Sequence, residues 1–130
     1  MDFSYDPSVQ PDLKSWTSCD EGDRIQKVIE HHQQARVELP NDRIHAAIHV
    51  AVENQALLGK RTPVAGVLDR LQDEGLDRHD ALHAVGSVLA EHIWELTSGR
   101  RGEAENPDQA YYDGLRALTA EQWLAEHRDD

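Results

Sequence analysis

Apolar residues recur along most of this chain at the three- and four-residue spacing of amphipathic helices, and no segment shows the alternation of a half-buried strand. Prolines, glycines and capping side chains separate the helical segments. The predicted helices are Asp20–Leu39, Asp42–Leu58, Thr62–Gly75, Asp77–Thr97, Pro107–Ala117 and a last helix after Thr119. The expected fold class is therefore all-α, an antiparallel helical bundle of four to six helices with two central helices.

Residues 1–20 differ from the rest because prolines, serines and aspartates there interrupt any sustained period. We expect a flexible or surface-lying N-terminal arm over 1–20 and a single helical domain over 21–130. A chain of 130 residues fits one domain. It should bury about two-thirds of the surface that the unfolded chain exposes.

Two helices have apolar residues on nearly every face, which is typical of central helices. In Asp42–Leu58 isoleucine, valine, leucine and alanine cover most of the circumference, and from Ala81 to Ala90 only His83 and Ser87 are polar. Their polar residues should therefore face the interior and need partners there.

Histidines on these two helices lie four residues apart, and a glutamate follows at a further multiple of four. The two sets are His45, His49, Glu53 and His79, His83, Glu91. Residues four apart share one face of an α-helix, so each set forms a ridge of nitrogen and oxygen donors. If the two helices pack together, the ridges can face one another.

Imidazole and carboxylate donors that converge in a dry interior suit a divalent transition metal, here zinc, iron or manganese. The expected ligands are the six residues of the two ridges, of which His79, near the start of its helix, is the weakest. His32 is a further candidate on the apolar stripe of the first helix. The alternatives are a buried hydrogen-bond network and histidines that pack separately.

Other metal and catalytic motifs do not fit the spacing. Neither HAAIH nor HDALH has the glutamate that follows the first histidine in zincins, and the order is wrong for the Glu-x-x-His of ferritin-like sites. The doublet His79-Asp80 is similar to that of metal-dependent phosphohydrolases, but Asp80 is explained more simply as a first-turn acid. The single cysteine, Cys19, has no partner and no assigned base.

Charge and hydropathy restrict the partners. The net charge is −12, which disfavours nucleic acid and anionic membrane surfaces. No apolar run approaches the roughly 20 residues of a membrane span, and the N-terminus lacks the pattern of a secretory signal, so we expect a cytoplasmic protein. A homodimer or a basic protein partner remains compatible with the composition.

The strings HAAIHVAVENQ and HDALHAVGSVLAEHIW, separated by a segment with Pro63, resemble the signature of a bacterial family catalogued as domain of unknown function 1841. The resemblance covers about residues 41–96. The resemblance implies an α-helical protein in which the histidines and glutamates belong to one unit. It implies no activity or substrate.

Two functions follow as expectations, and neither settles whether the chain is an enzyme. The first is a metal-binding helical protein, hydrolytic or oxygen-handling if a ligand position stays open to water. The second is a non-catalytic acidic interaction module with a buried His/Glu hydrogen-bond network. Its surface would include aromatic residues, although these pack in cores more often: Trp94, Tyr111, Tyr112 and Trp123.

Overall fold

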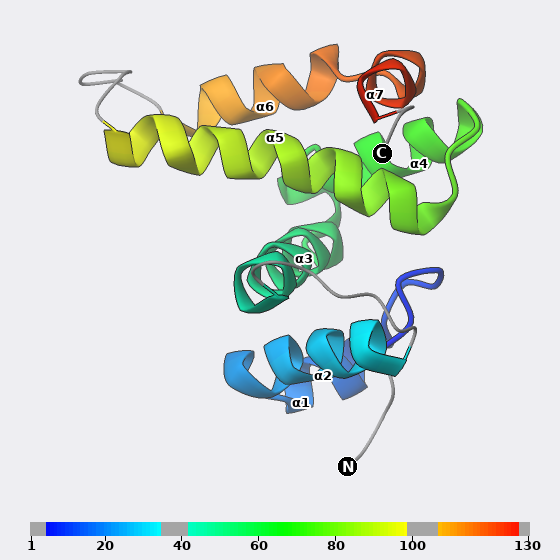
Figure 1. Cartoon of the computed structure of the whole chain (residues 1–130), viewed down its shortest axis with the longest axis vertical. Coiled ribbons are helices and arrows are strands. Elements are labelled where there is room, and N and C mark those ends of the chain that lie inside the picture. Colours follow the sequence, from blue (N-terminus) through cyan, green and yellow to red (C-terminus); the bar gives the residue numbers. More distant parts are fainter. Residues whose placement is uncertain (1–4, 35–41, 99–106, 128–130) are drawn as a thin grey trace.

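The computed structural model describes residues 5–34, 42–98 and 107–127, and these ranges contain seven α-helices, one short 3-10 helix and no strand (Figure 1). The α-helices are α1 (Leu13–Ser18), α2 (Glu21–Gln34), α3 (Asp42–Leu57), α4 (Val64–Asp73), α5 (Arg78–Ser98), α6 (Pro107–Ala117) and α7 (Ala120–His127). The 3-10 helix, η1 (Gly59–Arg61), precedes α4. The prediction of an all-α protein is confirmed.

Most helix boundaries agree with the capping signals in the sequence. Asp77 accepts a hydrogen bond from the backbone N–H of Asp80 at 2.8 Å, and Thr119 accepts one from Gln122 at 3.1 Å. Each bond satisfies one of the N–H groups that a helix start leaves without a partner. The expected end of the first long helix at Leu39 and the expected cap Asn41 lie outside the described residues.

The helix α1 was not predicted, and it changes the picture of the N-terminal arm. The side chain of Trp16 is completely buried, and its indole N–H donates to Asn54 Oδ1 on α3 at 2.7 Å. Arg24 on α2 donates to the same oxygen at 3.0 Å and to the backbone carbonyls of Trp16 and Cys19. These bonds attach α1 to both α2 and α3. The division at residue 20 into arm and domain stays a prediction, but the described part of the arm contributes to a core.

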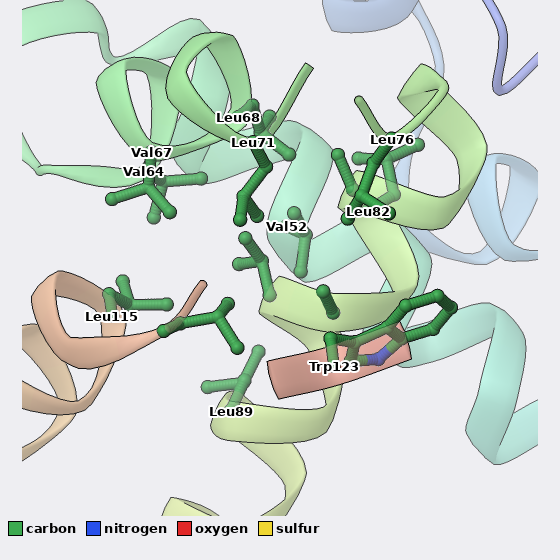
Figure 2. Close-up of a cluster of buried hydrophobic side chains, with 14 of the residues drawn as sticks. Val52, Val64, Val67, Leu68, Leu71, Leu76, Leu82, Leu89, Leu115 and Trp123 are labelled. Carbon is green, nitrogen blue, oxygen red and sulfur yellow. The ribbon is translucent and has the colours of Figure 1, made fainter. Parts of the chain in front are cut away.

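Two hydrophobic cores lie on either side of α3. The larger core is built from α3 to α7 and includes leucines of α4, α5 and α6 together with Trp123 of α7 (Figure 2). The smaller core comprises Tyr5, Trp16, Val28, Ile29, Ala46 and Val50. Because α3 contributes to both, it needs apolar residues nearly all round. The sequence pattern of this helix therefore has a direct structural cause.

The two central helices cross steeply, since α3 is seen almost end-on in Figure 1 while α5 extends across the view. They come very close at Gly86, where an added Cβ would lie 2.9 Å from Ile48 Cγ2. Helices that cross in this way face one another over a short stretch only. His49 and His83 lie within one turn of Ile48 and Gly86, so the two histidine ridges meet beside the crossing.

The aromatic residues divide between core and surface. Tyr111 and Trp123 are buried, Tyr112 is half-buried, and Trp94 is 52% exposed near the end of α5. Tyr111 and Trp123 therefore pack in the core, which is the more frequent role of such aromatic residues. Among the described residues, no helix is both long enough and apolar enough to span a bilayer.

A polar corner joins α4 to the segment between α6 and α7. Arg70 donates to the carbonyls of Leu115 and Leu118 at 3.2 and 2.7 Å, and it pairs with Glu74 at 2.6 Å. Glu74 in turn accepts a bond from the backbone N–H of Ala120 at 2.9 Å, the first residue of α7. These bonds hold the pKa of Glu74 below its ordinary value, that to Ala120 most of all.

We predict that Gly86→Ala destabilises the protein and that Gly66→Ala does not. The new methyl group at position 86 meets the stiff, β-branched Ile48, so we expect a loss of about 1–3 kcal/mol in the free energy of unfolding. Gly66 is an exposed residue of α4 with nothing within 4 Å of an added Cβ. Alanine there should gain about 0.5–1 kcal/mol through helix propensity. Urea denaturation measures both, and equal gains at the two positions would contradict the close crossing.

A second prediction concerns stability at acidic pH. Because folding lowers the pKa of Glu74, its contribution is present above the ordinary value of 4.5 and is lost as the pH falls through the folded-state pKa. Glu74→Gln should therefore lower stability at neutral pH and flatten its decline below about pH 4.5. Thermal melts from pH 3 to 7 test this, with Asp69→Asn, at an exposed position of α4, as the control. An identical pH profile in both variants would refute the role of Glu74.

Candidate metal centre

Four imidazole rings form a cluster between α3 and α5, which we call the histidine cluster: His45, His49, His79 and His83. Ring centroids within a helix are 4.8 Å apart for His45 and His49 and 4.3 Å apart for His79 and His83. Across the helices, His83 lies 5.0 Å from both His45 and His49, and His49 lies 5.4 Å from His79. The histidines of the two predicted ridges therefore do face one another.

Within the cluster, His45, His49 and His83 have the geometry of a metal-ligand set. One ring nitrogen from each lies within 4.8 Å of the other two, and we call these residues the three-histidine group. The Nε2 atoms of His49 and His83 are 3.1 Å apart. Two imidazole nitrogens bound to one ion at about 2.1 Å lie about 3.0 to 3.4 Å apart in octahedral or tetrahedral sites. The spacing of this pair thus fits a shared ion as well as a hydrogen bond.

A chain of polar side chains contacts His49 at Nδ1, the ring nitrogen that does not face His83. Tyr5, ahead of α1, places its hydroxyl 3.1 Å from His49 Nδ1 and donates to Glu53 Oε2 at 2.7 Å. Glu53 lies one turn after His49 on α3 and is completely buried. Arg78, the first residue of α5, donates to both oxygens of Glu53, at 2.6 and 2.9 Å.

Burial makes the pairing of Glu53 necessary. An ionised carboxylate inside a protein is stable only when it is paired and hydrogen-bonded, and the bidentate bonds of an arginine supply both. Burial also raises the pKa of the Tyr5 hydroxyl far above its ordinary value, and the neighbouring charge of Glu53 raises it further. The hydroxyl therefore keeps its proton at all physiological pH values and acts as a donor.

The two glutamates of the predicted ligand set are not part of the three-histidine group. Glu53 uses its oxygens to accept bonds from Arg78 and Tyr5, and Glu91 is exposed on α5. For Glu91, eight residues after His83, the physical reason is the helical period of 3.6, which rotates its side chain by about 80° from the face of His83. A spacing of four residues therefore keeps two side chains on nearly the same helix face, whereas a spacing of eight does not.

The remaining candidates lie at different distances from the site. His79 contacts His83 but is not one of the three residues with ligand spacing. The side chain of His32 lies outside the described part of the structure. Its neighbour His31 places its ring 6.1 Å from His79 and 6.0 Å from Tyr5.

Three residues of the site were missed by the sequence analysis: Tyr5, Arg78 and His31. Tyr5 lies in a segment without periodicity, and its contacts join residues 44 and 48 positions apart. Arg78 directly precedes the doublet of His79 and Asp80, and the sequence assigns it no role in the site. A usable signal existed for this residue, because a glutamate predicted to be buried on a central helix demands a cationic partner.

The fold and the site together define an all-helical protein with a group of buried and half-buried imidazoles at metal-ligand spacing where two central helices cross. Comparison with known families then identifies the chain: it belongs to the family described as "Domain of unknown function (DUF1841)", which matches residues 22–117. The resemblance noted from residues 41–96 is thus confirmed and extends over most of the chain. No curated protein and no solved structure matches it.

We predict that Arg78→Met is severely destabilising, by about 3–5 kcal/mol, because it leaves the charge of Glu53 buried without compensation. The matched control is Arg116→Met. Arg116 forms an exposed pair with Asp113 at 3.4 Å, so we expect a change within about 0.5 kcal/mol. Chemical denaturation of both variants gives the comparison. Similar small losses would mean that the pair of Arg78 and Glu53 is solvated.

Proposed function

We propose that this protein binds a divalent transition metal through the imidazoles of His45, His49 and His83. The observation that carries the proposal is the convergence of three ring nitrogens within 4.8 Å of one another. Two of these nitrogens come from α3 and one comes from α5, so all three side chains are held by packed helices. Such rigid support is what a metal site requires.

The chemistry of the donor atoms restricts which metal ions fit the proposed site. Glu53 is engaged by Arg78 and Tyr5, so the proposed first coordination sphere contains neutral nitrogen donors. Imidazole suits zinc, iron, copper and nickel, whereas magnesium, calcium and manganese prefer oxygen ligands. We therefore favour zinc or ferrous iron over manganese among the ions expected from the sequence.

The number of protein ligands determines whether the ion keeps a coordination position open to water or has all its positions filled by side chains. Three histidine ligands would leave one coordination position for water. A bound divalent ion would lower the pKa of that water, so that it could supply hydroxide as a nucleophile near neutral pH. His79 is close enough to His83, at a ring separation of 4.3 Å, to be the candidate for a fourth ligand. A three-histidine site supports a hydrolytic activity, and a four-histidine site supports a structural one.

One observation favours a second candidate function. Arg78, Glu53, Tyr5, His49 and His83 form a continuous chain of short polar contacts that needs no ion. In that case the histidines would serve to join α3 and α5, and the protein would be a non-catalytic module. The two candidates differ in metal content.

The deciding experiment is elemental analysis of tag-free protein purified without added metal or chelator. We expect about one equivalent of zinc or iron, lost in His49→Ala and in His83→Ala. A chelator should also lower the melting temperature of the parent protein, since an ion at 100 times its Kd adds about 2.7 kcal/mol to stability.

The control for these variants is His92→Ala. His92 is buried, as His49 is, but its ring stacks on Tyr111 at 5.4 Å rather than on the histidine cluster. This variant should lose stability and keep its metal. Metal far below one equivalent in the parent, not restored by adding zinc or iron in turn, would rule out the proposed site and favour the hydrogen-bond network.

A further inference from the structure

The buried hydroxyl group of Tyr5 is not required for the packing of its ring. The ring is 4% exposed and lies 5.8 Å from the ring of Trp16, a contact that phenylalanine would make equally well. The hydroxyl is a buried polar group, and it touches two side chains of α3, His49 and Glu53. Burying such a group is unfavourable unless its bonds are made, so its partners indicate its role.

The hydrogen bonds assign the protons of this group. Tyr5 has one proton to donate, and it donates to the closer, charged oxygen of Glu53 at 2.7 Å. At 3.1 Å from His49 Nδ1 the same hydroxyl oxygen is then an acceptor, so Nδ1 must carry a proton. A neutral imidazole has a single N–H. The network therefore leaves the Nε2 atom of His49 without a proton, as an acceptor or a metal ligand, and this is the atom that lies 3.1 Å from His83 Nε2.

Arg78 contacts both the carboxylate that accepts from Tyr5 and the segment that carries Tyr5. Besides Glu53, its guanidinium donates to the backbone carbonyls of Pro7 and Val9, at 3.0 and 3.1 Å. These two carbonyls belong to the turn that follows Tyr5. The same arginine thus pairs with Glu53 and holds the segment that presents the tyrosine.

We propose that Tyr5 is a positioning residue, which keeps the proton of His49 on Nδ1 and so presents Nε2 to the transition metal. This inference rests on the proposed function and adds the N-terminal segment to the site. Partners behind a metal-binding histidine orient the ring and raise its basicity, and losing one typically weakens metal binding about 10- to 100-fold. Because linkage is reciprocal, the bound ion should in turn favour docking of the segment around Tyr5 on α3.

The first test uses the metal-free parent protein, so it does not depend on the folding of any variant. Long-range proton–nitrogen NMR correlations at pH 8 distinguish the two tautomers of each neutral histidine. We expect His49 to carry its proton on Nδ1. A proton found on Nε2 of His49 would overturn the assignment, whatever the metal content of the protein.

The second test compares Tyr5→Phe with Tyr111→Phe. Tyr111 is equally buried, and its hydroxyl donates to Gln55 at 2.6 Å, away from the histidine cluster. Each variant loses one buried hydroxyl, so both should lose similar stability. Zinc affinity, measured by competition with a chelating dye, should fall about 10- to 100-fold in Tyr5→Phe only. In this variant the His49 tautomer should also shift toward Nε2–H.

The outcomes separate the two proposals. If Tyr5→Phe binds zinc as tightly as Tyr111→Phe, the positioning role is wrong while metal binding stands. If the parent protein binds no zinc or iron, the proposed function is wrong, and the tautomer of His49 in the metal-free protein still confirms or refutes the proton assignment of Tyr5.

Discussion

The arrangement around the site depends on one constraint, the charge of Glu53 in a completely buried position. A carboxylate there requires partners with strong, well-directed hydrogen bonds. One partner, Arg78, comes from the start of α5, and the other, Tyr5, comes from the N-terminal segment. Three parts of the chain that are far apart in sequence are therefore brought to one point. The histidine cluster lies beside this point because His49 is one turn from Glu53 on the same helix.

The site also lies between the two hydrophobic cores, and this position explains its mixed environment. On α3, Ala46 and Val50 belong to the smaller core and Val52 and Ala56 to the larger one, and the 3.6-residue period places these pairs on different faces. His49 occupies the sector between these two faces and is almost fully buried, whereas His45 and His83 are half-buried. Such a site combines rigid support with access from outside, which a reactive metal centre needs and a purely structural one does not.

Local patterns predicted the helices and half of the site. Each helix start with a capping side chain depends on residues within three positions, and the pairing of His45 with His49 follows from one turn of helix. The support for His49 could not be predicted in this way. Tyr5 and Arg78 reach Glu53 through contacts 48 and 25 positions apart, and nothing in their local sequence indicates that pairing. Short amphipathic pieces such as α1 are also hard to predict, because a helix of six residues is stabilised by tertiary contacts rather than by its own propensity.

The position of α3 between the cores has a consequence for how the molecule opens. A local opening of the chain exposes one contiguous packed unit and leaves the others intact. Here both cores pack on α3. If either core separated from α3, one face of a helix on which the other core also packs would be exposed. Partial opening that spares one core is thus unfavourable, and we expect the two to melt as one cooperative unit although they share no side chain.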